Sequence, residues 1–132
     1  MPPEVWLISI PPGILTALLL FLNEFPDLEA DKQGGRNHLL IRFGRNTGAY
    51  IYATGAITTY LIIMVLPILG ISSWWIYIAL LPLPLVFNNI RTTFLYYNNS
   101  AKLLPALGGN VVTVLVTDLL LAGSLALAIL IV

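Results

Sequence analysis

The residues of this chain best suited to chemistry lie in the segment 23–36, where four carboxylates and two cations directly follow a long apolar run. On an α-helix, Asn23, Asp27 and Asp31 fall at successive steps of four, so their side chains share one face. That face can bind a divalent cation. The chain has no cysteine and a single histidine, and oxygen ligands of this kind indicate Mg²⁺, which completes its shell with water and phosphate oxygens.

The cations beside this face suggest a phosphate ligand. Lys32 and Arg36 follow Asp31 within about a turn, and they can neutralise the phosphate charge that the metal ion does not neutralise. Arg42 and Arg91 could reach the same phosphate, or they could anchor loop ends at the membrane surface, as we expect for Arg45.

A solvated helix end is the alternative interpretation of the acidic segment. Two effects speak against it. Carboxylates at the C-terminal end of a helix face the negative end of the helix dipole, and they also repel one another. A bound cation would relieve both penalties, so we favour a metal–phosphate site.

The composition predicts an all-α polytopic membrane protein. The chain is 58% hydrophobic and 9% charged, with a mean hydropathy of +0.91. Four apolar runs are long enough to cross a hydrocarbon core of about 30 Å. They cover residues 4–22, 47–69, 71–87 and 108–132. No repeat or linker divides them, so we expect a single membrane domain over residues 1–132.

The distribution of charge predicts the orientation in the cell membrane. All six cations fall between the first and second runs or between the third and fourth. By the positive-inside rule, both charged loops face the cytoplasm, and the two termini and the 69–73 turn lie on the opposite side. Pro26 should bend the acidic turn away from the spanning helix, because proline removes one backbone hydrogen bond.

Two further polar side chains allow less definite interpretations. Asp118 lies deep in the last run, where Thr113 and Thr117 could hydrogen-bond to it, or where it could line an acceptor pocket. His38 lies in the charged loop, and we expect it to be solvated rather than a metal ligand.

The segment NEFPDLEADKQGG at 23–35, followed by LIRFG at 40–44, resembles the second Asp-rich motif of the UbiA superfamily of intramembrane prenyltransferases. The residues of this motif are most similar to those of menaquinone-type 1,4-dihydroxy-2-naphthoate prenyltransferases. The resemblance implies the C-terminal part of a nine-helix bundle. It also implies Mg²⁺-dependent transfer of an isoprenoid chain from a prenyl diphosphate to an aromatic acceptor in quinone biosynthesis.

The resemblance also assigns roles to single residues. Asn23, Asp27 and Asp31 would coordinate Mg²⁺, with Asp27 and Asp31 as the catalytic pair. The diphosphate-binding residues would be Asn23, Lys32, Arg36 and Arg42. The expected partners are the prenyl diphosphate, the aromatic acceptor and the lipid bilayer, with no nucleic acid.

The first Asp-rich motif of that superfamily has no counterpart in this sequence. The resemblance implies that this motif and about five helices precede Met1, in the same chain or in a second one. A diphosphate leaving group needs its charge met on several sides, so we expect the 132 residues alone to be catalytically poor. The alternative is a non-catalytic remnant or subunit that binds a diphosphate lipid or partner helices.

Overall fold

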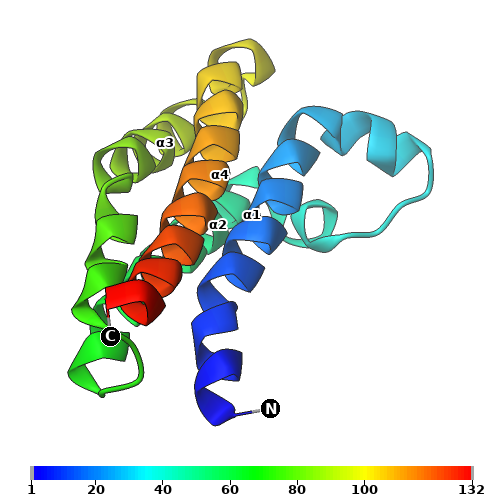
Figure 1. Cartoon of the computed structure of the whole chain (residues 1–132). Coiled ribbons are helices and arrows are strands. Elements are labelled where there is room, and N and C mark those ends of the chain that lie inside the picture. Colours follow the sequence, from blue (N-terminus) through cyan, green and yellow to red (C-terminus); the bar gives the residue numbers. More distant parts are fainter. Residues whose placement is uncertain (1, 132) are drawn as a thin grey trace.

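The computed structural model describes residues 2–131, and Figure 1 shows an assembly of long helices. The elements are α1 (Pro3–Gln33), α2 (Leu39–Ile68), the short 3₁₀ helix η1 (Trp74–Leu80), α3 (Leu83–Tyr96) and α4 (Ser100–Ile131). Four helical segments are long and apolar enough to cross a membrane, with η1 and α3 together forming the third. The predicted all-α membrane architecture is confirmed.

Helix α1 continues through the acidic segment. It begins with proline in its first turn, where the missing N–H costs nothing, and it ends at Gln33 with Gly34 as the C-cap. Gly35 then turns the chain with a φ of +77°, a conformation that glycine adopts without strain. Figure 1 shows the last turns of α1 running at an angle to its earlier part, as the proline at position 26 predicts. The acidic residues therefore stand on a helix that bends away from the span.

Helix α2 is interrupted near its start. Gly44 has φ +85° and ψ 164°, and this non-helical conformation separates a short first turn from the long part that follows. The third span is also broken, because Pro82 and Pro84 cannot donate the backbone hydrogen bonds that a continuous helix needs. The predicted runs at 47–69 and 71–87 thus correspond to the second part of α2 and to η1 with the start of α3.

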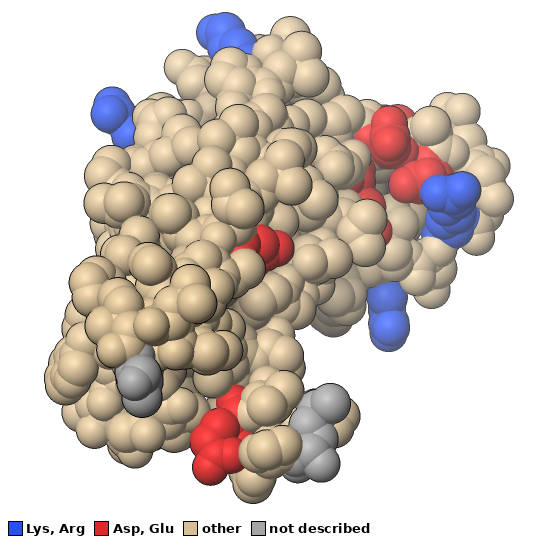
Figure 2. Space-filling view, viewed as in Figure 1, with Lys and Arg blue, Asp and Glu red and all other residues tan. Residues whose placement is uncertain are grey.

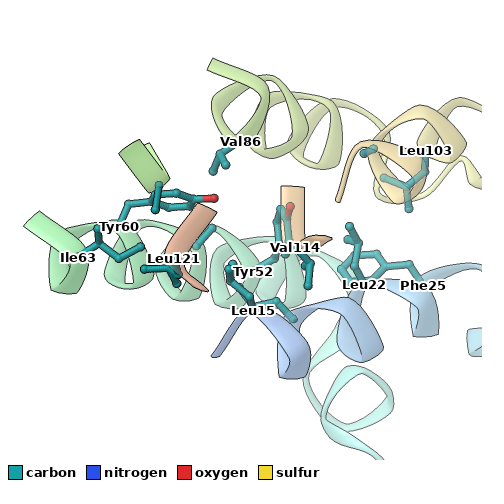
Figure 3. Close-up of a cluster of buried hydrophobic side chains, with 14 of the residues drawn as sticks. Leu15, Leu22, Phe25, Tyr52, Tyr60, Ile63, Val86, Leu103, Val114 and Leu121 are labelled. Carbon is teal, nitrogen blue, oxygen red and sulfur yellow. The ribbon is translucent and has the colours of Figure 1, made fainter. Parts of the chain in front are cut away.

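The helices pack around one apolar core. Helix α1 contacts α2 and α4, while α4 also contacts η1 and α3, and α2 lies against α3 and η1. Figure 3 shows core side chains from different helices directed toward one another. The largest buried apolar members are Leu15, Leu22, Phe25, Leu40, Tyr52, Ile63, Ile76 and Leu103.

Buried polar contacts join α4 to its neighbours. The Tyr52 hydroxyl donates to Asn110 Oδ1 at 3.0 Å, and the Tyr60 and Thr117 hydroxyls lie 2.7 Å apart. Asn89 on α3 donates to Thr113 Oγ1 at 3.2 Å. Such bonds between spanning helices hold them together where apolar packing gives no preference over lipid. Thr113 and Thr117 therefore bond to Asn89 and Tyr60, and no hydrogen bond joins either of them to Asp118 in the described chain.

Connections gather at two ends of the bundle. Figure 1 shows the beginning of α1, the α2–η1 connection and the end of α4 at the lower end of the view, and the α3–α4 connection at the upper end. The outward face of α4 carries large exposed apolar side chains, among them Leu115, Leu119, Ile129 and Leu130. A face of this kind suits contact with lipid or with further helices.

Candidate functional site

The acidic turn of α1 presents two side chains openly. Asn23 and Asp27 are exposed, one helical turn apart on the face that the sequence predicts. Figure 2 shows acidic and basic atoms grouped together at the right of the view, where Figure 1 places the end of α1 and its connection to α2. The charge of the site is therefore concentrated at one corner of the bundle.

Asp31, the third member of the predicted face, is held by two basic side chains. Its side chain is only 13% exposed. Arg36 Nη1 lies 3.3 Å from Asp31 Oδ1, and His38 Nε2 lies 3.1 Å from Asp31 Oδ2. The backbone N–H of Arg36 also donates to the Asp31 carbonyl at 3.0 Å, which folds the chain back after Gly35. Both carboxylate oxygens of Asp31 thus have a partner.

His38 bridges two carboxylates of α1. Besides Asp31, it approaches Glu24, whose Oε2 lies 3.2 Å from His38 Nδ1. Its side chain is 20% exposed, so the expectation of a solvated histidine is wrong. The reason is that Glu24 and Asp31 lie two turns apart on one side of α1, and the connection brings the imidazole between them. No periodic signal in a loop sequence predicts this contact.

The other predicted phosphate-binding cations are less closely joined to the turn. Lys32 lies 4.0 Å from Glu29, and both side chains are largely exposed. Arg42 is exposed, and its guanidinium lies 5.9 Å from the centre of the Phe43 ring. Lys32 thus pairs with Glu29 and Arg36 pairs with Asp31, whereas the guanidinium of Arg42 lies against its neighbour in the chain.

Arg45 is a residue of this corner that sequence reasoning assigned elsewhere. Its Nε and Nη2 atoms both donate to the backbone carbonyl of Phe25, at 3.3 and 2.9 Å. Phe25 directly precedes the proline in the acidic turn. Arg45 thus joins α2 to the bend of α1, in place of the membrane-surface role expected from its position in a loop.

The donor set fits one hydrated magnesium ion. Asn23 and Asp27 offer open oxygen atoms, and Mg²⁺ commonly uses one or two carboxylates and keeps several waters. Within the described residues, no group of three or more His, Cys, Asp or Glu side chains is close enough to bind a metal. Asp31 can still contribute, since a carboxylate has about four lone-pair sites and can accept from Arg36 and His38 while binding an ion.

An apolar groove of about 400 Å³ adjoins the acidic turn between α1 and α2. Its walls come from apolar side chains of both helices, and its polar members are Glu24 and His38. The full lining is Ala17, Leu18, Leu20, Phe21, Glu24, His38, Leu39 and Ile51. A hydrocarbon chain fits such walls, while the charged groups stand at one end of the groove.

Comparison with known proteins matches the sequence of this chain to a family. The model of the UbiA prenyltransferase family matches residues 1–107. The chain is 35% identical over 78 residues to a 1,4-dihydroxy-2-naphthoate octaprenyltransferase from Bacillus subtilis, an alignment covering 59% of this chain and 25% of that protein. The chain thus spans about a quarter of the length of the curated relative that it matches. No solved structure matches the chain. The acidic turn, the helical architecture and the family match together lead to one conclusion: this chain belongs to the UbiA prenyltransferase family.

Proposed function

We propose that this chain is the C-terminal half of a membrane prenyltransferase of quinone biosynthesis. The substrates would be a prenyl diphosphate and an aromatic acceptor of the dihydroxynaphthoate type. The family match and the naphthoate octaprenyltransferase relative support this proposal. The observation that carries it is the exposed pair Asn23 and Asp27 near the C-terminal end of α1, in the same segment as Asp31 and its partner Arg36.

Different residues of the acidic turn would bind the metal ion and the diphosphate. Asn23 and Asp27 would hold the metal ion, and Asp31 would add a carboxylate oxygen. Lys32 and Arg36 would donate to diphosphate oxygens, since charge-assisted hydrogen bonds are the strongest available to such a group. We also propose Arg42 as a diphosphate ligand, because this residue is exposed. When bound, Mg²⁺ neutralises negative charge that grows on the leaving diphosphate.

Arg36 has a second role in this proposal. Arg36 Nη1 lies 3.3 Å from Asp31 Oδ1, and the Arg36 side chain is 73% exposed. The guanidinium lies at the surface, so it could turn from the carboxylate to a diphosphate, which is also an anionic acceptor. Asp31 would then have one oxygen released for the metal ion, while His38 keeps the other in position.

The remaining wall of the site would come from outside these residues. A single Asp-rich turn meets the charge of a diphosphate on one side only, which gives weak binding and little acceleration. We propose that the opposing Asp-rich motif lies in an N-terminal half, in the same polypeptide or in a second chain, and that residues 1–132 belong to one membrane domain with it. The exposed apolar face of α4 is compatible with further helices.

The decisive experiment measures Mg²⁺-dependent transfer of a radiolabelled prenyl group to 1,4-dihydroxy-2-naphthoate in membranes that contain both halves. We expect Asp27→Asn and Asp31→Asn each to reduce the rate about 100-fold or more, because each removes a carboxylate ligand of the Mg²⁺ ion that would neutralise the leaving diphosphate. Glu29→Gln is the matched control, since Glu29 is an exposed carboxylate of the same turn that pairs only with Lys32. Wild-type rates in both aspartate variants would refute the proposal. Absence of product with both halves present would favour the non-catalytic alternative.

The proposed orientation can be tested separately. We propose that the α1–α2 and α3–α4 connections face the cytoplasm and that the α2–η1 connection faces the opposite side. The chain has no cysteine, so single cysteines at Gln33 and Ser73 can be labelled in intact cells with a membrane-impermeant maleimide. Labelling at Ser73 and protection at Gln33 is the expected result, and the reverse would invert the topology.

A further inference from the structure

Helix α1 is weakened where its acidic face begins. Pro26 has no N–H, so the backbone carbonyl one turn earlier lacks its helical donor, and the ring pushes the turn open. Proline alone permits a range of bend angles. A site that must present Asn23 and Asp27 at a defined angle therefore needs a second element to hold the bend.

Arg45 provides a contact at that point. Its guanidinium donates twice to the Phe25 carbonyl, through Nη2 at 2.9 Å and Nε at 3.3 Å. A carbonyl oxygen has two lone pairs, so it can accept from an arginine in addition to a helical N–H. The two donors of a planar guanidinium fix direction as well as distance, which a single flexible ammonium does not.

The backbone of α2 is built to deliver this side chain. Gly44 adopts φ +85° and ψ 164°, which strains any other residue, and Arg45 is the first residue after this break. One turn later Gly48 allows close approach of α1, because a Cβ there would lie 3.0 Å from Phe25 Cζ. Phe25 itself is fully buried. The two glycines thus bring the start of the long part of α2 against the bend.

We propose that Arg45 is a positioning residue that fixes the angle between the acidic turn and the spanning part of α1. It acts through the Phe25 carbonyl and does not touch a substrate. The functional meaning of this inference rests on the proposed function, because the turn that Arg45 holds carries Asp27 and Asp31. The geometric claim stands on the contact alone and is tested without any assay of prenyl transfer.

The test is a distance measurement between two spin labels on α1, one before the bend and one after it. Thr16 and Gln33 are exposed, and the absence of native cysteine allows specific labelling of cysteines placed there. With the purified protein in lipid nanodiscs, the wild type should give one narrow distance distribution. In Arg45→Gln we expect a broader distribution whose maximum shifts toward the about 26 Å that this separation spans on a straight helix.

Two further variants distinguish geometry from charge. Arg42→Gln removes the same charge three residues earlier, where the guanidinium faces Phe43, and should leave the distance distribution unchanged. Arg45→Lys keeps the charge but loses the fork, so it should give an intermediate width. A wild-type distribution in Arg45→Gln, or full restoration by lysine, would overturn the proposal. If Arg45→Gln does not fold, the lysine variant alone decides, because a wild-type width there contradicts the need for two donors.

The outcome separates this inference from the proposed function. An altered distance distribution together with absent prenyl transfer in the wild type would support the positioning role and refute the enzyme. Normal prenyl transfer by the wild type, together with an unaltered distance distribution in Arg45→Gln, would support the proposed function and refute the positioning role. Mn²⁺ can replace Mg²⁺ as a probe, and its binding can be followed by its EPR signal. If the bend angle sets the spacing of the metal ligands, the affinity for Mn²⁺ should fall severalfold in Arg45→Gln. An unchanged affinity would contradict this consequence.

Discussion

The Nε2 atom of His38 lies 3.1 Å from Oδ2 of Asp31, although the two residues are seven positions apart and the end of a helix lies between them. This contact closes the connection between α1 and α2 over the acidic turn. It also places an imidazole against a carboxylate to which we assign a role in binding metal and diphosphate.

Replacing His38 should loosen that connection. His38→Ala removes the contacts to Asp31 and Glu24, and a lost hydrogen bond to a charged group costs about 1.5–3 kcal/mol when it is well formed. We expect amide hydrogen exchange in residues 34–39 to become roughly tenfold faster. Asn37→Ala is the control, since Asn37 is exposed and adjacent. Equal exchange in both variants would show that the bridge does not restrain the connection.

Replacing Arg36 should weaken binding of the diphosphate substrate. With Arg36→Gln we expect the KM for prenyl diphosphate to rise roughly tenfold, because one charge-assisted hydrogen bond is lost. Lys102→Gln serves as the comparison, since Lys102 lies over the Tyr96 ring at the other connection. Steady-state kinetics at saturating acceptor provide the measurement. Parallel increases in KM for both variants would point to general surface charge instead of a specific contact.

Gly48 should not tolerate a side chain. A Cβ there would lie 2.5 Å from Leu40 Cδ1 and 3.0 Å from Phe25 Cζ, and both of these side chains are buried. Gly48→Ala should therefore destabilise the protein by about 1–3 kcal/mol, the usual cost of overpacking. Gly13→Ala has open space and should change the melting temperature little. Thermal unfolding in detergent micelles compares the two, and equal melting temperatures would disprove the tight α1–α2 contact.

Tyr52→Phe tests the polar contact between α2 and α4. The change removes the hydroxyl that donates to Asn110 Oδ1 and leaves the ring in place. Hydrogen bonds between spanning helices contribute about 0.6 kcal/mol on average and up to about 1.7 kcal/mol, so we expect a loss within this range. Tyr50→Phe, at an exposed ring that packs on Phe94, provides the reference. Unfolding in mixed micelles of SDS measures both, and a stability equal to that of the reference would show that the bond contributes nothing.

Much of the architecture could be predicted because the signals are local. Apolar runs of spanning length depend only on composition, and the shared face of Asn23 and Asp27 depends only on the period of a helix. The proline bend in α1 and the break in the third span also follow from the chemistry of single residues.

The contacts of His38 and Arg45 could not be predicted in the same way. Each depends on backbone conformations at glycines, Gly35 and Gly44, which redirect the chain between the two helices. A charged residue between apolar runs carries no periodic signal, so a surface role is the default interpretation. One local signal is that Arg45 directly follows Gly44 at the start of a span. A glycine at this point indicates a sharp change of chain direction, which can direct the next side chain toward a neighbouring helix.

The contacts of the acidic corner and those of the polar core differ in their separation along the chain. Arg45 reaches the Phe25 carbonyl across 20 residues, whereas the Tyr52 and Tyr60 hydroxyls meet α4 across 58 and 57 residues. Short-range contacts form early, because little chain entropy is lost in closing them. During biosynthesis, α1 and α2 can therefore enter the membrane as a hairpin with the acidic turn already set at its angle, before α4 has been translated. The bundle then assembles around a contact between α1 and α2 that has already formed.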